Sequence, residues 1–413
     1  MQVADNTDPR IRKALDRALD AGEKGVQIAA LLDGELIVDA WAGETGTGRP
    51  VDGGTLFPVF SVTKAVTASV IHVWAQRGLI DLDRPVADVW PEYAAHGKGG
   101  ITFDHVLSHR SGAPTIGADT TLEELCDWDT MAARVADQSP VAEPGTRNAY
   151  SPFAFGWVLG EAVRRVDPQR RPFLEIVRQE VLLPLGMDDF FLGLPDDQRH
   201  RVAPLVGDSA PTTGPDRLLE EASPSHLPFA PSMFNLPQVQ RAGLPSAGGI
   251  ATARATVRLF DAYAAARRQD GERFFTGDTL RRCRSPRPVG IDHTYGFGMP
   301  VGHGGLWHIA PGVSDDSPGG ALTEGVLSHT GAGGTIAWTE PELGLSVAVL
   351  HNRMFFGPQP VAPFGAVGGA RAPGAAARGG DGARARPHGG AAVAGGAAPR
   401  GPPPPPAGSP RSA

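Results

Sequence analysis

Strand-like runs lie near both ends of the chain, and helical patterns fill the stretch between them. Near the N-terminus, two apolar runs flank Asp33-Gly34, and such a pair around Asp-Gly is a strong signal for a β-hairpin. This order predicts an α/β (α+β) fold with one antiparallel sheet built from both chain ends and flanked by helices. A helical subdomain is expected as an insertion at about residues 80–240. The other expected strands are residues 295–301, 325–328, 334–338 and 345–350, and the expected helices are residues 9–22, 62–77, 153–166, 172–183 and 251–268.

The size and composition of the chain narrow its class. With 413 residues, 41% of them hydrophobic, the chain can bury a sizeable core. The N-terminal residues lack the basic and apolar regions of a signal peptide, and no apolar run approaches the roughly 18 residues of a membrane span. Two cysteines, Cys126 and Cys283, fit neither a disulfide framework nor a zinc spacing. We therefore expect a cytoplasmic protein without membrane contact, and the formal net charge of -7 argues against nucleic acid as a partner. The oligomeric state is not indicated.

The last 53 residues differ from the rest of the chain. Alanine, glycine, proline and arginine fill 45 of these 53 positions, and Phe364 is the only aromatic residue. Such a segment cannot bury enough apolar surface to fold, so we expect a folded domain over residues 1–360 and a disordered tail over residues 361–413. The same composition also arises when a GC-rich gene is translated out of frame, which resequencing the 3′ end of the gene would test.

A serine and a lysine lie three residues apart in Ser61-Val62-Thr63-Lys64, where a helix is expected to begin. At that spacing the two side chains share one helix face, and a buried lysine amine can accept the proton of a serine hydroxyl. Ser-x-x-Lys is short enough to occur by chance. However, lysine is rare here, at four positions among 38 basic residues, and apolar neighbours surround Lys64. These features favour a nucleophile and its base.

Two further segments carry candidate partners of Ser61. Tyr150 lies in a turn before an expected helix, where a tyrosine serves either catalysis or packing. The run from Ser328 to Gly334 joins two strand-like runs, and its glycines allow close approach of the backbone to a ligand. An ordinary glycine-rich hairpin turn is the equally good structural interpretation.

Three motifs in this order, Ser61-Val62-Thr63-Lys64, Tyr150-Ser151-Pro152 and His329-Thr330-Gly331, resemble the serine β-lactamase-like superfamily. The resemblance is strongest to its esterase branch, the family VIII carboxylesterases, which are related to class C β-lactamases and D-alanyl-D-alanine peptidases. It extends over about residues 10–356 and implies a β-lactamase/transpeptidase-like fold. Further segments that resemble family landmarks are residues 104–112, 245–249, 295–298 and 341–345.

The resemblance also implies roles for single residues. Ser61 would be the acylated nucleophile, with Lys64 and Tyr150 as its proton-handling pair. The backbone N–H groups of Ser61 and Ala332 would form the oxyanion hole. No metal and no organic cofactor is implied, and the partner would be a small-molecule ester. The implied substrate-binding residues are Pro152, His329, Thr330 and Gly331.

Two departures from the family pattern bear on the substrate. Pro152 stands where β-lactamases and peptidases usually carry an asparagine that binds the acyl-amide group, and His329 stands where they usually carry a lysine. Proline has no side-chain donor, and histidine is mostly neutral at pH 7. Both changes weaken recognition of an anionic peptide or β-lactam, so we expect neutral, short-chain esters as substrates. A third departure is the tail, because family members usually end in a helix packed on the sheet.

Other functions stay open at this point. An α/β-hydrolase needs Gly-x-Ser-x-Gly, which the chain lacks, since the run at Ser246 misses its first glycine. His105 and His109 have the spacing of a metal pair but no third ligand nearby, so we interpret both as structural. A β-lactamase, a D-alanyl peptidase or an acyltransferase would use the same acyl-enzyme. A binding protein on this fold is the non-enzymatic alternative.

Overall fold

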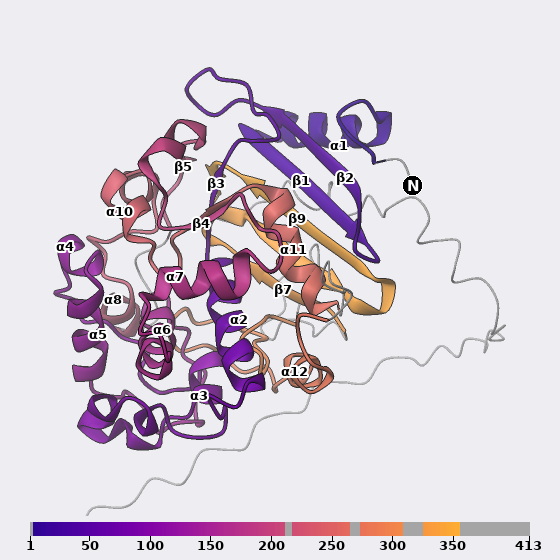
Figure 1. Ribbon diagram of the computed structural model, residues 1–413. Coiled ribbons are helices and arrows are strands. Elements are labelled where there is room, and N and C mark those ends of the chain that lie inside the picture. Colours follow the sequence, from indigo (N-terminus) through magenta and orange to yellow (C-terminus); the bar gives the residue numbers. More distant parts are fainter. Residues whose placement is uncertain (1–2, 211–216, 265–272, 309–324, 356–413) are drawn as a thin grey trace, which may run out of the picture. The chain divides into compact units, whose positions relative to one another are not determined.

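A five-stranded antiparallel sheet joins the two ends of the chain (Figure 1). The computed structural model describes residues 3–210, 217–264, 273–308 and 325–355, all within one compact unit. The strand order is β2-β1-β9-β8-β7, so the N-terminal hairpin pairs directly with a strand from the last third of the chain. The predicted sheet from both chain ends is thereby confirmed. Its strands are β1 (Gly25–Leu32), β2 (Glu35–Gly43), β7 (Leu327–Thr330), β8 (Ile336–Glu340) and β9 (Leu345–His351).

The hairpin of β1 and β2 turns where the sequence predicts it. Asp33 and Gly34 both have positive φ, 52° and 81°, which is the backbone conformation of the tight turn that Asp-Gly favours. β1 is buried along almost its whole length because both of its faces are covered. Ala29 and Leu31 belong to the main core, whereas Val26 and Ile28 belong to a second core on the other face.

Different helices cover the two faces of the sheet. Helix α11 (Ala253–Tyr263) packs on β1, β8 and β9. Helix α1 (Pro9–Asp20) buries Ile11, Ala14, Leu15 and Ala18 in the second core and begins at Asp8, whose carboxylate accepts the N–H of Arg10. Both helices were expected from the sequence, and α11 ends a few residues earlier than predicted within the described part of the chain.

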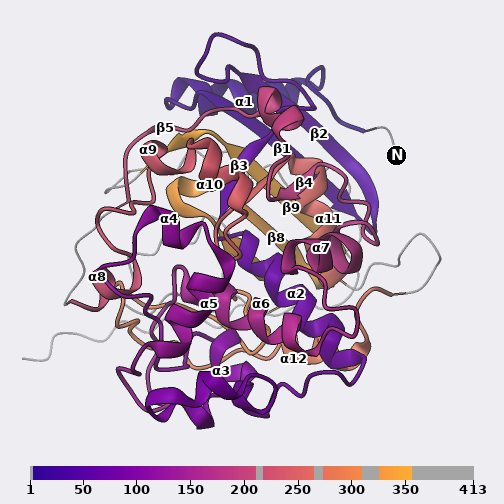
Figure 2. The same ribbon diagram turned by 60° about the vertical axis from the view of Figure 1, so that its left-hand side comes forward.

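Helix α2 (Thr63–Gln76) lies between the sheet and the helical part of the protein, as Figure 2 shows. Every residue from 63 to 74 is buried, including polar ones, because the helix has neighbours on all sides. Two of these neighbours are α6 (Ala154–Val166) and α7 (Phe173–Val177), which continues as a π-helical turn over Arg178–Leu182. The predicted helices at 62–77, 153–166 and 172–183 are therefore present. The remaining helices are α3 (Phe103–Leu107), α4 (Leu122–Leu125), α5 (Trp128–Asp137), α8 (Leu218–Ala222), α9 (Pro231–Phe234), α10 (Pro237–Ala242) and α12 (Gly277–Cys283).

Two small sheets lie outside the main sheet, and short 3-10 segments cover Val86–Asp88, Pro91–Gly100, Asp196–Arg201, Ala332–Gly334 and Pro341–Leu343. A three-stranded sheet has the order β3-β6-β4 and holds the strand that leads into α2. A two-stranded parallel pair joins β5 (Val206–Gly207) and β10 (Arg353–Met354). The strands of the former are β3 (Phe57–Phe60), β4 (Phe190–Leu192) and β6 (Gly249–Ala251).

The predicted strand at residues 295–301 is wrong. The segment forms a tight loop, with single bridges from Ile291 to Gly298 and from Val301 to Trp307 in place of a continuous strand. Asp292 causes this local fold, because its carboxylate accepts the backbone N–H groups of Thr294 and Tyr295 that a strand would need.

Within the described residues, no helix is long and apolar enough to cross a membrane. The predicted tail at residues 361–413 lies outside the described part of the chain, so its disorder and its origin stay predictions.

Candidate active site

Ser61 lies in the sharp turn between strand β3 and helix α2. Phe60, the residue before it, has a φ of 47°, a left-handed conformation that costs a bulky residue about 1–3 kcal/mol. Thr63 holds this turn, because its hydroxyl donates to the carbonyl of Phe60 at 2.5 Å and accepts the N–H of Gly249 at 2.9 Å. The turn leaves Ser61 at the N-terminal end of α2 and 8% exposed. Such local strain is typical of functional sites.

Lys64 is fully buried one helical turn after Ser61. Its Nζ lies 3.1 Å from Ser61 Oγ, 2.9 Å from the carbonyl oxygen of Pro152 and 3.1 Å from that of Ser246. Burial lowers the pKa of Lys64 well below its usual range. A neutral amine has two N–H groups and one lone pair, and a carbonyl oxygen can only accept. When both N–H groups go to the two carbonyls, the lone pair faces the Ser61 hydroxyl, which is the arrangement of a base.

The carbonyl at Ser246 is itself held in place. The Ser246 hydroxyl donates to the carbonyl of Phe153 at 2.6 Å and accepts the N–H of Gly156 at 2.8 Å. A Cβ on Gly156 would lie 2.4 Å from the carbonyl carbon of Pro245, so only glycine allows α6 to approach this closely. This role of Ser246 was not predicted from the sequence. The landmark at residues 245–249 was the available signal, but no sequence pattern indicates that a backbone oxygen binds a distant lysine.

Tyr150 is buried beside this pair. Lys64 Nζ lies 4.9 Å from the centre of the Tyr150 ring. Burial raises the pKa of Tyr150, and a hydrogen bond with the Ser61 side chain opposes that shift only in part. The phenol therefore keeps its proton at neutral pH. The three residues with predicted catalytic roles thus lie together, and the geometry favours Lys64 as the base and Tyr150 as a proton donor.

His109 lies against Tyr150, and His105 makes its contact elsewhere. The rings of His109 and Tyr150 are 4.3 Å apart between centroids, and His109 Nδ1 accepts the N–H of Ser151 at 3.1 Å. His105 instead accepts the N–H of Thr102 at the start of α3. Within the described residues, no group of three or more histidine, cysteine, aspartate or glutamate side chains could hold a metal ion. Both histidines therefore make contacts within the fold.

The third motif ends strand β7. His329 is fully buried and donates from Nδ1 to the carbonyl of Thr330 at 2.8 Å. Burial and the nearby Lys64 amine lower the pKa of His329 to about 3, so its ring is neutral at physiological pH. A Cβ on Gly331 would lie 2.6 Å from the carbonyl oxygen of Val59, so glycine is needed where β7 meets β3. Ala332, the next residue, is partly buried against the main core.

Asp292 fixes the backbone of Tyr150, a role that sequence analysis missed. Its Oδ2 accepts the Tyr150 N–H at 2.5 Å, and the Thr294 hydroxyl donates to the Tyr150 carbonyl at 2.8 Å. With the N–H groups of Thr294 and Tyr295, the buried carboxylate has three backbone donors. The signal in the sequence was a lone aspartate three residues before the predicted strand at 295–301, which was too weak to indicate this role.

Replacing Asp292 by alanine is expected to lower the free energy of unfolding by about 2–5 kcal/mol, because three buried N–H groups lose their acceptor. Urea denaturation followed by circular dichroism measures this change. Asp278→Ala is the matched control, since Asp278 is exposed and pairs with Arg281 at the surface. Equal stability of the two variants would contradict the stabilising role assigned to the hydrogen bonds of Asp292.

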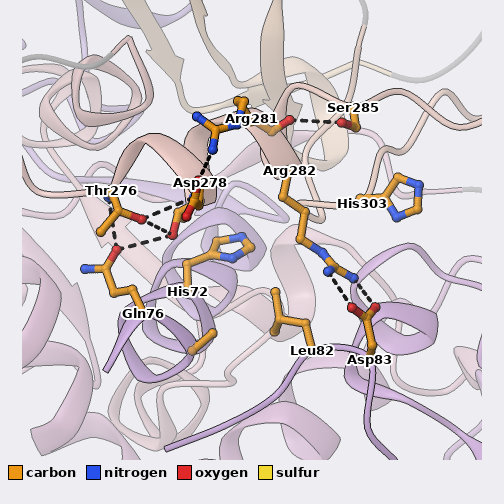
Figure 3. A pocket seen from close by; sticks show the side chains of 12 residues that line it. His72, Gln76, Leu82, Asp83, Thr276, Asp278, Arg281, Arg282, Ser285 and His303 are labelled. Carbon is orange, nitrogen blue, oxygen red and sulfur yellow. Dashed lines mark hydrogen bonds and ion pairs between the residues drawn. The ribbon is translucent and has the colours of Figure 1, made fainter. Parts of the chain in front are cut away.

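A hollow of about 790 Å³ lies on the far part of α2, and neither Ser61 nor Lys64 lines it (Figure 3). His72 and Gln76 of α2 form one wall, and residues of α12 form another. Its charged groups already have partners, since Arg282 pairs with Asp83 at 2.6 Å and with Asp104 at 3.0 Å. This hollow is therefore not the substrate site expected at Ser61.

Comparison with known proteins agrees with this fold. The sequence matches the family described as Beta-lactamase over residues 11–368. It is 32% identical over 354 residues to "Esterase/beta-lactamase LipL" of Mycobacterium tuberculosis, covering 80% of this chain and 77% of that protein. It is 28% identical over 333 residues to "Esterase EstB" of Burkholderia gladioli, covering 75% of this chain and 80% of that protein. A crystal structure of a family VIII carboxylesterase superposes with a TM-score of 0.75 at 28% identity, covering 87% of this chain and 96% of that one.

The family match and the relatives named as esterases define an esterase/beta-lactamase-like hydrolase. The chain belongs to the beta-lactamase family. The β-lactamase/transpeptidase-like fold expected from the three motifs is thereby confirmed.

Proposed function

We propose that the protein is a serine esterase that hydrolyses short-chain carboxylic esters through an acyl-enzyme on Ser61. The observation that carries the proposal is the setting of Lys64, whose amine contacts two carbonyl oxygens and Ser61 Oγ and lies in a fully buried position. Two curated relatives named as esterases support the ester-hydrolase activity.

In the acylation step, Ser61 Oγ attacks the ester carbonyl carbon while its proton passes to Lys64 Nζ. The negative charge on the carbonyl oxygen is stabilised by the backbone N–H groups of Ser61 and Ala332, and losing one such donor costs about 3–4 kcal/mol. The intermediate then expels the alcohol oxygen, which takes a proton from Tyr150, and the Lys64 ammonium restores the Tyr150 proton. One alcohol leaves, and the acyl group stays on Ser61.

In the deacylation step, a water molecule attacks the acyl carbon and gives its proton to the same lysine and tyrosine pair. Ser61 leaves the carbonyl carbon and takes that proton back. The sum of both steps is ester plus water to carboxylic acid plus alcohol. An acyltransferase would replace the water by a second alcohol, so product analysis in the presence of added alcohol separates the two activities.

Neutral esters are favoured over anionic β-lactams by the residues near Ser61. The neutral ring of His329 offers no positive charge to a substrate carboxylate. Pro152 offers no side-chain amide, and its carbonyl oxygen already binds Lys64. Thr330 and Gly331 complete the proposed substrate-binding segment, with the Thr330 carbonyl occupied by His329.

An assay with two chromogenic substrates tests the proposed specificity. We expect kcat/KM for p-nitrophenyl butyrate to exceed that for a chromogenic cephalosporin by about 10- to 100-fold, the effect of one absent hydrogen bond to a charged group. Cephalosporin turnover as fast as ester turnover would favour the β-lactamase alternative. No turnover of either substrate, with the protein folded, would favour a binding protein.

A further inference from the structure

The loop from Ile291 to Gly298 is built onto the backbone of Tyr150. The Asp292 N–H donates to the Phe297 carbonyl at 2.8 Å, and this bond closes the loop. The Asp292 carboxylate and the Thr294 hydroxyl hold the N–H and the carbonyl of Tyr150. The backbone of this loop therefore has a fixed position relative to the backbone of Tyr150.

Aromatic rings lead from Tyr150 to the surface along this loop. The ring centroids of Tyr150 and Tyr295 are 5.8 Å apart, and those of Tyr295 and Phe297 are also 5.8 Å apart. Phe297 is 44% exposed, and Ile291, which pairs with Gly298 at the base of the loop, is 50% exposed. Contiguous exposed apolar side chains mark binding surfaces, and the Ile291–Gly298 bridge places Ile291 beside the residue that follows Phe297.

This aromatic row carries no charge of its own. The one carboxylate within the loop, that of Asp292, is buried and accepts backbone N–H groups, so it is not exposed to a ligand at the surface. Aromatic rings bind other apolar groups through burial of surface and through ring stacking. The matching ligand is therefore a neutral apolar group, above all an aromatic ring.

The position of the row beside Tyr150 indicates which half of an ester it contacts. In the proposed mechanism, on which this inference rests, Tyr150 gives its proton to the alcohol oxygen as that oxygen leaves. The alcohol half of the substrate must then lie on the Tyr150 side of Ser61. We propose that Tyr295, Phe297 and Ile291 form a subsite for the alcohol half and select esters of aromatic or bulky apolar alcohols.

Kinetics with benzyl butyrate and ethyl butyrate test this subsite. Both esters form the same butyryl-enzyme, so a difference in kcat/KM between them arises before the shared deacylation step. We expect the full-length protein to prefer benzyl butyrate by roughly tenfold or more. Phe297→Ala should reduce this benzyl-to-ethyl ratio by about threefold to tenfold, the contribution of one aromatic contact.

Leu343→Ala is the matched control, because Leu343 is equally exposed at 45% but lies in the turn before β9. It should leave the ratio unchanged. Ile291→Ser provides a second variant of the subsite, and thermal melting reports whether each variant is folded. An unchanged ratio in folded Phe297→Ala and Ile291→Ser would overturn the subsite, as would a change that follows the acyl chain in a series of ethyl esters.

The failure of this inference is distinguishable from failure of the proposed function. If p-nitrophenyl butyrate acylates Ser61 but Phe297→Ala leaves the benzyl-to-ethyl ratio of kcat/KM unchanged, only the subsite is wrong. If no ester acylates Ser61, the proposed function is wrong and the subsite fails with it.

Discussion

Lys64→Arg lowers kcat/KM for p-nitrophenyl butyrate by about a thousandfold, within the range of contributions from a general base. Arginine has much of the length of lysine, but it stays protonated in a protein, so it cannot accept the proton of Ser61 as a neutral Lys64 amine does. Initial rates of p-nitrophenolate release measure the effect. Lys13→Arg is the matched control, because Lys13 is exposed on α1 and the same exchange there changes no buried contact.

The pH profile gives the same prediction a second readout. Because burial lowers the pKa of Lys64, the amine is neutral above that lowered value and protonated below it. We therefore expect kcat/KM to fall as the pH falls through the pKa of Lys64 and to reach a plateau above it. An arginine variant that kept both the rate and this acid limb would show that another group is the base.

Ser61→Ala removes esterase activity almost completely, with a loss in kcat of about ten-thousandfold or more, as for other nucleophiles of acyl-enzyme mechanisms. The loss is expected without unfolding, because Ser61 contributes one small side chain in a turn that Thr63 holds through its own hydrogen bonds. Ester hydrolysis and thermal melting are measured in parallel. Ser225→Ala, at an exposed serine, controls for the loss of a hydroxyl alone. Full activity in folded Ser61→Ala would contradict the mechanism.

The sequence contained most of the information about the sheet. Asp33-Gly34 located the hairpin, because few residue pairs tolerate two successive positive φ angles. The order of strand-like and helical runs gave the sheet built from both chain ends. The segment at 295–301 was assigned wrongly because side-chain periodicity does not reveal a buried aspartate that takes the backbone N–H groups of a strand.

The candidate site was predictable to the extent that it depends on local spacing and motifs. Two residues three positions apart share one helix face, which brings Ser61 and Lys64 together. The order of the three motifs indicated Tyr150 as their partner. Contacts made through the backbone were not predictable. The carbonyls that bind Lys64 come from Pro152 and Ser246, positions 88 and 182 residues away, and a carbonyl has no residue-type signature. The hydrogen bond from the Tyr150 N–H to Asp292 was unpredictable for the same reason, because a side chain there binds a distant backbone group.

Mass spectrometry of the protein after brief incubation with p-nitrophenyl butyrate tests the central claim most directly. The claim predicts a butyryl group on the proteolytic peptide that contains Ser61. The group should be present in the protein without substitutions and in Ser225→Ala, and absent in Ser61→Ala. Turnover of the ester with the butyryl group on another residue, or with no change when Ser61 is replaced, would contradict it.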